Sequence, residues 1–394
     1  MKTAAIIGAG NIGRGFIGQI MSEGGYEVCF IDVAAPVVDA LNERHEYPLE
    51  IVSSRGTVKK TVKNVRAVNG NDHEAAARVI ADCDICVTCV GAKAIKYIIP
   101  NFVAGVKLRY SEGKKPINLL ICENLMDADK YIKSLLEPEL SSEELDFVGL
   151  VETSVGRMVP LPDKALLEID PLLVRAEAYP VLPCDKDAFK GEVPEIKNVI
   201  PVSPFRFIIE RKLYIHNMGH AVCAYLGMRK KYTYICEAIA DPEIRVVVRE
   251  AMTESAVALA KRYNKPLDEL LAHTDDLIRR FGNTALGDTC ERVGNDIPRK
   301  LAMSDRLTGA SLSVIEAGGH PTYICIGAAA ALVKYYQENK ILSPTAFTEL
   351  TGIQDGEYRE TVLNIAGRFS GGAPLSEIIT FADQRLANLS GTIM

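Results

Sequence analysis

A stretch in the middle of the chain brings together side chains that can move protons. Within nine residues it holds Lys212, His216, Asn217 and His220. Apolar residues surround the stretch and it contains no proline, which predicts one helix over about 205–228. At about 100° per residue, His216 and His220 lie about 40° and 80° around this helix from Lys212, and Asn217 about 140°. Polar groups on one arc of an apolar helix need hydrogen-bond partners or a functional role, because an unpaired buried polar group costs about 1–3 kcal/mol.

Several interpretations of this arc are open from the residues alone. The side chains can form a solvated stripe whose histidines bond to backbone carbonyls, or a catalytic face on which Lys212 gives and takes a proton. A lysine in a cleft beside histidines has its charged form disfavoured, which suits acid/base catalysis near neutral pH. The i, i+4 spacing of His216 and His220 also suits zinc. However, Asn217 replaces the glutamate of the H-E-x-x-H motif, so we expect no metal.

A glycine-rich motif near the start of the chain predicts the binding of a dinucleotide. A short apolar run over 3–7 leads into Gly8-x-Gly10-x-x-Gly13 and then into an apolar-periodic helix. The glycines permit a tight turn, approach of a pyrophosphate and close packing of helix on strand, and the helix N-terminus offers free amides to the phosphates. The next predicted strand ends at Asp32, whose carboxylate would accept hydrogen bonds from both ribose hydroxyls and repel a 2′-phosphate. We therefore expect NAD as the cofactor.

The residues predicted to contact the cofactor lie in three loops. They are Gly8, Gly10, Asn11, Ile12, Gly13, Arg14, Asp32, Val90 and Gly91. The last two follow a predicted strand over 85–90, at a strand end where the backbone often passes close to a nicotinamide.

Strands and helices alternate through the rest of the first half, which indicates an open parallel sheet. Further strands are predicted over 117–122, 147–151 and 166–169, a hairpin insertion over 49–68, and helices over 37–43, 73–81 and 94–101. Polar residues collect after several of these strands, where open α/β sheets bind ligands. Asn124 is the best candidate among them, as an uncharged amide donor beside the nicotinamide. A helix-capping asparagine is the alternative.

The pattern becomes helical after residue 200. Asp241 and Pro242 predict an N-cap and first residue of a helix that ends near residue 263, and further helices are predicted over 267–281 and 323–339. We therefore expect a Rossmann-type dinucleotide-binding domain over 1–200 and a mostly α-helical substrate domain over 201–394. A dehydrogenase built this way has its cleft between the domains, which favours the catalytic interpretation of Lys212.

The composition excludes several other classes of function. With 394 residues and a net charge of −6, the chain offers no basic surface that would indicate a nucleic-acid partner. Its longest uncharged apolar run, over 323–333, is far shorter than a membrane span, and the apolar start is too short for a signal sequence. We expect a cytoplasmic protein. The spacing Cys83-x-x-Cys86-x-x-Cys89 lies on a predicted strand, where alternate side chains face opposite ways and cannot share one cluster.

The motifs together resemble a known family. Lys212-x4-Asn217-x2-His220 matches the K-x4-N-x2-H signature of the polyol-specific long-chain dehydrogenases/reductases, which work without a metal. Within that family, other stretches are similar to the mannitol-1-phosphate 5-dehydrogenases. These are residues 8–18, 122–124, 210–213, 219–221, 224–227, 298–301 and 305–307. The resemblance covers nearly the whole chain.

This resemblance implies NAD-dependent interconversion of D-mannitol 1-phosphate and D-fructose 6-phosphate without a metal. It implies that Lys212 is the general acid/base, that Asn217 and Asn124 hold the reacting oxygen, and that His220 orients the substrate. One departure concerns the family sequence V-D-R, which reads Val155-Gly156-Arg157 here and lacks the carboxylate. The alternatives are a hexuronate reductase of the same family, acting on tagaturonate or fructuronate, and a non-catalytic NAD-binding sensor.

A sugar phosphate needs cationic partners, and one basic cluster could supply them. Its members are Arg292, Arg299, Lys300 and Arg306. Ordinary surface charges are the alternative interpretation, and a sugar acid would also need cations, so the cluster does not decide the substrate. We expect a small sugar phosphate as the substrate, no nucleic-acid or membrane partner, and a monomer or small homo-oligomer.

Overall fold

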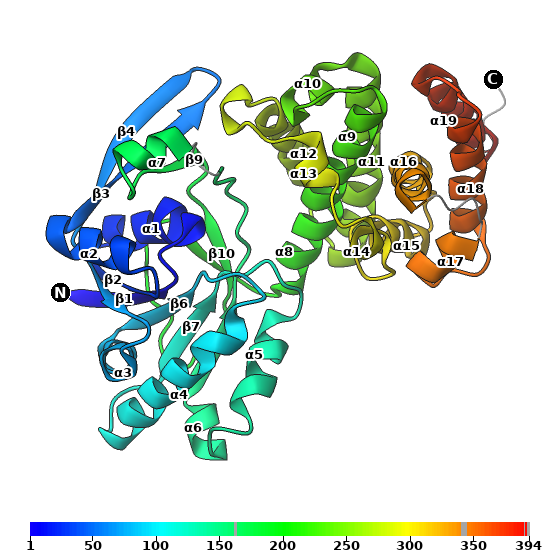
Figure 1. The fold of residues 1–394 in the computed structure, drawn as a ribbon. Coiled ribbons are helices and arrows are strands. Elements are labelled where there is room, and N and C mark those ends of the chain that lie inside the picture. Colours follow the sequence, from blue (N-terminus) through cyan, green and yellow to red (C-terminus); the bar gives the residue numbers. More distant parts are fainter. Residues whose placement is uncertain (161–163, 340–344, 390, 392–394) are drawn as a thin grey trace. The chain divides into compact units, whose positions relative to one another are not determined.

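The computed structural model describes residues 1–160, 164–339, 345–389 and 391 (Figure 1). The chain divides into two compact units, which we call unit 1 (Met1–Ile208) and unit 2 (Ile209–Met394). Among the described residues, no helix combines the length and the apolar character needed to cross a membrane.

Unit 1 is built on a six-stranded parallel sheet in the order β5-β2-β1-β6-β7-β8. The strands are β1 (Lys2–Ile7), β2 (Tyr26–Asp32), β5 (Val65–Asn69), β6 (Ile85–Thr88), β7 (Ile117–Ile121) and β8 (Val148–Glu152). Strands β2 and β5 lie on one side of β1, whereas β6, the next strand of this sheet along the chain, lies on its other side. Ligands of such sheets bind outside the carboxyl ends of the strands at this reversal, here β1 and β6.

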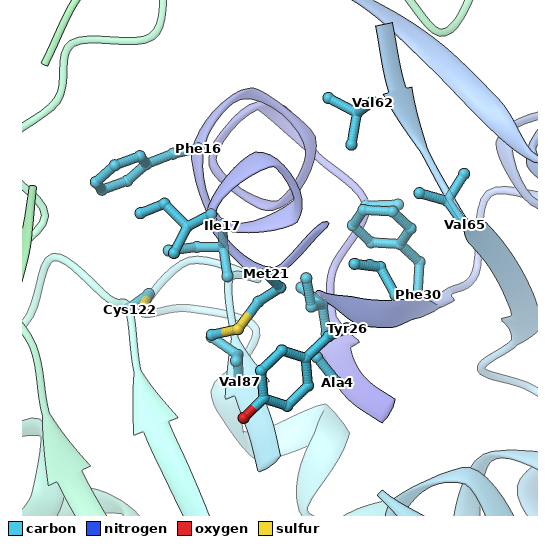
Figure 2. Close-up of a cluster of buried hydrophobic side chains, with 14 of the residues drawn as sticks. Ala4, Phe16, Ile17, Met21, Tyr26, Phe30, Val62, Val65, Val87 and Cys122 are labelled. Atoms are coloured by element: carbon cyan, nitrogen blue, oxygen red, sulfur yellow. The ribbon is translucent and has the colours of Figure 1, made fainter. Parts of the chain in front are cut away.

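Helices cover both faces of this sheet, so its strands are buried apolar runs (Figure 1). The helical segments are η1 (Gly13–Ile17), α1 (Gly18–Glu23), α2 (Ala35–Arg44), α3 (His73–Asp82), α4 (Ile95–Ser111), α5 (Ala128–Leu136) and α6 (Ser142–Asp146). On one face, Phe16, Met21 and Phe30 of β2 belong to one cluster of buried hydrophobic side chains (Figure 2). On the other face, α3, α4 and α5 contribute residues such as Phe102 and Ile132. The Rossmann-type fold predicted for this half is confirmed.

A second, smaller sheet flanks the first within unit 1. Strands β3 (Glu46–Ser53) and β4 (Gly56–Lys63) form an antiparallel hairpin, and β9 (Val174–Glu177) pairs with β3 in parallel. The predicted hairpin is thus present, but its last part was assigned wrongly, because buried Val65 and Ala67 belong to β5 of the main sheet. Two further strands, β10 (Leu182–Asp185) and β11 (Val199–Val202), pair with each other in parallel.

Two other local predictions in unit 1 were wrong. The strand predicted over 166–169 is a helix, α7 (Lys164–Ile169). Its sequence, K-A-L-L-E-I, is rich in residues of high helix propensity, and this outweighed the short apolar run. The helix predicted over 94–101 is α4, which continues to Ser111 because apolar residues such as Phe102 and Val106 keep the helical period.

Unit 2 is helical, as predicted. Its segments are the end of α8 (Arg206–Arg211, a helix that begins in unit 1), η2 (Lys212–Asn217), α9 (Met218–Arg229), α10 (Ile235–Ala240), α11 (Pro242–Tyr263), α12 (Leu267–Phe281), η3 (Thr284–Leu286), α13 (Cys290–Gly294), α14 (Ile297–Leu301), α15 (Thr308–Glu316), α16 (Thr322–Asn339), α17 (Thr345–Thr351), α18 (Glu357–Ser370) and α19 (Leu375–Leu389). The carboxylate of Asp241 accepts hydrogen bonds from the amides of Glu243 and Ile244 and caps α11, which confirms the predicted start.

Helix α9 lies at the centre of unit 2 and packs against α10, α11, α13 and α16. Its residues 218, 219 and 221–227 are all buried. Gly219 allows close packing against α11, because a Cβ there would lie 2.5 Å from the sulfur of Met252. The residues directly before α9 are therefore held on a rigid support.

Candidate active site

The helix predicted over 205–228 exists, but its middle is not α-helical. Segments α8, η2 and α9 follow one another without a break, and η2, from Lys212 to Asn217, is a π-helical turn. In such a turn residues five apart are joined by a backbone hydrogen bond, so Asn217 lies one turn from Lys212, closer to its side of the helix than the α-helical angle of about 140° implies. π-Helical turns are rare and often occur at functional sites.

The four side chains of this stretch differ in exposure. His216 is buried, with 8% of its surface exposed, whereas Lys212, Asn217 and His220 are half-buried. A fully solvated stripe does not describe this face.

His220 is held between a ring and a carboxylate. Its imidazole stacks on the ring of Phe281, with 4.7 Å between the ring centroids and 12° between their planes. Its Nε2 lies 3.2 Å from Oδ2 of Asp288, although the two atoms are not aligned for a hydrogen bond. Burial opposes the ionisation of Asp288, yet His220 and Arg292 beside it lower the pKa of this carboxyl below its ordinary value. Asp288 escaped the sequence interpretation, because no motif distinguishes it from a surface acid.

Basic side chains surround His216. Burial, and then the charges of Arg280, His220 and Lys212, hold its pKa well below the ordinary value for histidine. His273 has its pKa lowered to about 4 by burial and by nearby Arg211 and Arg280. His216 and His273 are therefore neutral at pH 7. His273 and Arg280 both lie on α12 and were missed from the sequence, because their place beside His216 depends on how α12 packs.

The predicted phosphate cluster divides according to which cations are already paired. Arg292 is 67% exposed in its side chain and bonds Asp288, with 2.8 Å from its Nε to the carboxylate. Arg299 donates to Asp296 at 2.5 Å and to Asp305 at 3.1 Å. Neighbouring carboxylates thus largely balance both guanidinium charges.

Lys300 differs from the other members. Only 4% of its surface is exposed, and it takes part in none of the ion pairs found between described residues. Burial, followed by the charges of Arg306 and Arg299, lowers its pKa to about 8. Arg306 bonds Asp305 through Nε at 2.7 Å. Lys300 is therefore the member of the cluster that would gain most from an incoming anion.

The glycine-rich loop has the geometry that a dinucleotide requires. Gly8 has a φ of +105°, and a Cβ there would lie 2.6 Å from the carbonyl oxygen of Cys89, at the end of β6. A Cβ on Gly13 would overlap the carbonyl oxygen of Gly8. Around Gly10 the space is open, with no atom within 4 Å of where a Cβ would lie. The loop is thus closely packed at Gly8 and Gly13, and the open space at Gly10 would let a pyrophosphate approach the backbone.

Asp32 and Arg14 shape this loop from opposite sides. Asp32 ends β2, and its two carboxylate oxygens accept the amides of Ala9 at 2.6 Å and Ala34 at 2.9 Å. Each oxygen keeps a second lone pair for a ribose hydroxyl. The buried Arg14 donates through Nε to the carbonyl of Ala9 at 2.6 Å and through a terminal nitrogen to that of Pro171 at 3.3 Å. Its side chain therefore supports the loop, and any contact with a cofactor would come from its backbone. Asn11 and Ile12 are half-buried where the loop enters η1.

The predicted residues at the end of β6 are held by an acid that the sequence interpretation did not single out. Gly91 has a φ of +87°. Its amide and that of Val90 both donate to the carboxylate of Glu123, at 2.7 and 2.9 Å. Asn124 follows Glu123 and is exposed at the carboxyl end of β7. The N-cap position of α5 is Asp127, three residues after Asn124, so the interpretation of Asn124 as a helix cap was wrong.

Gly156, where the resembled family has an aspartate, lies against an aromatic ring. A Cβ at this position would come 3.2 Å from Cε1 of Tyr179. The next residue, Arg157, is buried and donates to the carbonyl of Glu177 and the side-chain oxygen of Gln19, both at 2.7 Å. The backbone here is fixed by buried hydrogen bonds, and Tyr179 lies beside the position of the missing carboxylate.

Within the described part of the chain, no group of three or more His, Cys, Asp or Glu side chains is arranged to hold a metal ion. The metal-independent reaction stays a prediction.

Comparison with known proteins places this geometry in a family. The sequence matches the mannitol dehydrogenase Rossmann domain over residues 2–198 and the mannitol dehydrogenase C-terminal domain over residues 202–349. Proteins named mannitol-1-phosphate 5-dehydrogenase are 34% identical to it. The one from Brevibacillus brevis aligns over 393 residues, 99% of each chain, and the one from Thermoanaerobacter pseudethanolicus over 384 residues, 96% of this chain and 97% of its own.

Solved structures agree at the level of the fold. The ternary complex of Pseudomonas fluorescens mannitol 2-dehydrogenase with NAD and D-mannitol superposes with a TM-score of 0.74 at 16% identity, covering 98% of this chain and 94% of that one. A substrate-free D-sorbitol dehydrogenase superposes with a TM-score of 0.72 at 16% identity, covering 95% and 90%. The matches over both halves of the sequence, on the predicted architecture, show that this chain belongs to the mannitol dehydrogenase family.

Proposed function

We propose that this protein is an NAD-dependent oxidoreductase that interconverts D-mannitol 1-phosphate and D-fructose 6-phosphate. The observation that carries the proposal is its 34% identity, over nearly the full length of both chains, to two relatives named mannitol-1-phosphate 5-dehydrogenase. The glycine-rich loop and Asp32 support NAD as the cofactor, because the loop leaves room above Gly10 and the carboxylate keeps free lone pairs.

Lys212 is proposed as the general acid/base. In the oxidation of the polyol it would take the hydroxyl proton, and in the reduction it would return that proton. NAD, when bound, would supply the hydride acceptor and donor. The neutral amine is the form of a lysine that accepts a proton, so this role requires Lys212 to be deprotonated when the polyol is oxidised. Asn217, one π-helical turn from Lys212, is proposed to hold the reacting oxygen, and His220 to orient the substrate. For Asn124 we keep the role of a second amide donor to that oxygen.

Within the basic cluster we propose Lys300 as the main partner of the substrate phosphate. It is the buried cation without a carboxylate partner among the described ion pairs, and Arg306 lies near enough to add its charge. A phosphate dianion beside Lys300 would recover part of the cost of burying this cation, and Arg306, although it bonds Asp305, would add its charge. Arg292 and Arg299 already bond carboxylates and are proposed to contribute less.

The activity is tested by following NADH at 340 nm with the purified protein. We expect turnover of D-mannitol 1-phosphate with NAD⁺ and of D-fructose 6-phosphate with NADH, and weak activity with NADP⁺. Turnover of tagaturonate or fructuronate in place of the sugar phosphate would favour the hexuronate reductase. NADH binding without turnover of any of these compounds would favour the sensor.

The phosphate site is tested with Lys300→Met and its matched control Arg299→Met. We expect Lys300→Met to raise the KM for D-fructose 6-phosphate about 30-fold, the effect of losing one hydrogen bond to a charged group. For Arg299→Met we expect less than about a threefold change, since the lost charge was already balanced. Equal effects of the two substitutions would remove Lys300 from its proposed role.

We also propose that the protein is located in the cytoplasm and is a monomer or a small homo-oligomer.

A further inference from the structure

Glu123 makes an unusual pair of contacts for a side chain beside a ligand-binding loop. It follows β7, and its two carboxylate oxygens reach the neighbouring strand end, where Oε1 accepts the amide of Val90 at 2.9 Å and Oε2 accepts the amide of Gly91 at 2.7 Å. Only 7% of its surface is exposed. One buried carboxylate thus binds two successive amides of the turn after β6.

Burying this carboxylate is costly, so its presence needs a reason. Burial raises the pKa of Glu123 above the ordinary value, while the hydrogen bonds from Val90 and Gly91 oppose the rise. A turn at this position needs no charged side chain to form. Gly91, with its φ of +87°, adopts the left-handed conformation easily, but it also adopts others, so glycine alone does not fix the turn. The carboxylate selects one conformation by bonding both amides at once.

The turn lies where the sheet binds its ligand. Strands β1 and β6 are neighbours at the reversal of strand order, and the loops after them form the two sides of that crevice. The loops also touch, because a Cβ on Gly8 would lie 2.6 Å from the carbonyl oxygen of Cys89. A shift of the Val90–Gly91 turn would therefore displace the glycine-rich loop. Asn124, the proposed donor to the reacting oxygen, is joined to Glu123 by one peptide bond.

From these contacts we infer that Glu123 is a positioning residue for the nicotinamide half of the dinucleotide site. Its carboxylate fixes the Val90–Gly91 turn against the glycine-rich loop, so that the surface that receives the ring is formed before the cofactor binds. Glu123 touches neither substrate nor reacting atoms in this role. The inference rests on the proposed function only in taking a nicotinamide dinucleotide as the ligand of unit 1.

The substitution that tests this role is Glu123→Gln, which keeps the size of the side chain. The amide offers one acceptor in place of two and directs an NH₂ group at a backbone N–H. We expect the dissociation constant of NADH, measured by the fluorescence of bound NADH, to rise about tenfold. Hydrogen exchange at the amides of Val90 and Gly91 should become faster in the cofactor-free protein. The KM for the sugar phosphate should change less than about twofold, because uniform substrate binding is not affected.

Unit 2 contains a matched control. Glu254 is a half-buried acid whose two carboxylate oxygens likewise accept two successive amides, those of Tyr323 at 2.8 Å and Ile324 at 3.0 Å. Burial raises its pKa, as for Glu123, here to about 8. Glu254→Gln should change the midpoint of thermal unfolding about as much as Glu123→Gln but leave NADH affinity within about twofold.

The outcomes separate a positioning role from a structural one. Unchanged NADH affinity in Glu123→Gln, or an equal loss in Glu254→Gln, would overturn the inference. If Glu123→Gln fails to fold, Glu123→Asp keeps the charge, and it should bind NADH more tightly than Glu123→Ala at equal unfolding midpoints; equal affinities would contradict the role. NADH titration requires no polyol or sugar, so a protein that turns over neither proposed substrate would refute the proposed function and still test Glu123.

Discussion

Two π-helical turns found in the described part of the chain, η1 in unit 1 and η2 in unit 2, support function in different ways. In unit 1, η1 (Gly13–Ile17) is wholly buried and begins with a glycine pressed against the glycine-rich loop. In unit 2, η2 (Lys212–Asn217) has half-buried Lys212 and Asn217 with buried residues between them. The first turn positions backbone amides and the second positions side chains. Substitutions should therefore impair the two candidate sites in different ways. In the glycine-rich loop an added side chain causes steric overlap, whereas in η2 a substitution removes a functional group.

The largest effect is expected at Lys212. Lys212→Ala should lower the turnover number about a thousandfold, because it removes the proposed proton acceptor. The dissociation constant of NADH, measured by fluorescence titration, should stay within about threefold, since the glycine-rich loop belongs to unit 1.

Lys212→Arg is the informative control for this prediction. A guanidinium keeps the positive charge but does not lose its proton near neutral pH, so the variant should be about as inactive as Lys212→Ala. Substantial turnover in Lys212→Arg would mean that the charge matters rather than the proton, and turnover in Lys212→Ala would remove Lys212 from the mechanism.

A pair of glycine substitutions tests the glycine-rich loop, the candidate site that is formed by backbone atoms. In Gly13→Ala the new methyl group overlaps the carbonyl of Gly8, and we expect a loss of about 3 kcal/mol in the free energy of unfolding together with most NADH binding. In Gly10→Ala the methyl group enters open space, so the unfolding midpoint should stay within about 2 °C while NADH affinity falls about tenfold, because the pyrophosphate is kept away from the backbone.

Calorimetry and NADH titration of both variants check this contrast. Equal unfolding midpoints would contradict the close contact between Gly13 and Gly8. Full NADH affinity in Gly10→Ala would mean that the dinucleotide does not pass over Gly10.

The architecture was predictable because its signals are local. Buried strands read as continuous apolar runs, and the start of α11 is marked by the capping Asp241 followed by Pro242. The fingerprint from Gly8 to Asp32 spans a single strand–helix–strand unit, so its spacing could be recognised without knowing the rest of the sheet. Predictions that depended on pairing between strands far apart in the sequence were less accurate. Val65–Asn69 resembles a third strand of the hairpin, and only its pairing with β2 places it in the main sheet.

The candidate site was predictable in its residues more than in its contacts. Lys212, Asn217 and His220 stand out by their spacing, but the π-helical turn that brings Asn217 towards Lys212 depends on tertiary packing and has no signal in the sequence. Glu123 and Asp288 are acids like any others until the neighbours that they bind are known. In the basic cluster, likewise, Lys300 differs from Arg299 only through the positions of Asp296 and Asp305.

A smaller effect is expected at Asp288, which supports a side chain of unit 2 rather than acting itself. Asp288→Asn removes the charge 3.2 Å from Nε2 of His220, so the imidazole should be less well oriented. We expect kcat/KM for D-fructose 6-phosphate to fall about tenfold, which corresponds to about 1.4 kcal/mol. Asp296→Asn, at an exposed carboxylate that pairs with Arg299, is the control and should change kcat/KM less than about twofold. Equal effects in the two variants would show that the loss at Asp288 is not specific to His220.

The last prediction concerns the pH dependence of stability rather than turnover, and it follows from the basic groups around His216. His273 has a pKa of about 4 in the folded protein and an ordinary value of 6.5 when unfolded. Between these values the unfolded chain binds a proton that the folded chain does not, so the stability present above pH 6.5 is lost as the pH falls towards 4. Because His273 is half-buried, we expect a loss of about 2 kcal/mol, or roughly 4–8 °C in the unfolding midpoint of unit 2.

His273→Asn removes this proton-binding difference. The decrease of the unfolding midpoint between pH 7 and pH 4.5, followed by calorimetry, should therefore be smaller in this variant than in the unsubstituted protein. His73→Asn, at an exposed histidine of unit 1, is the control and should keep the original decrease. The buried His216, whose pKa is also lowered, should account for part of the acid sensitivity that remains. An identical decrease in His273→Asn would mean that the basic groups around His216 do not determine the acid stability of unit 2. The glycine-rich loop and the η2 site would then differ only in how they respond to substitution.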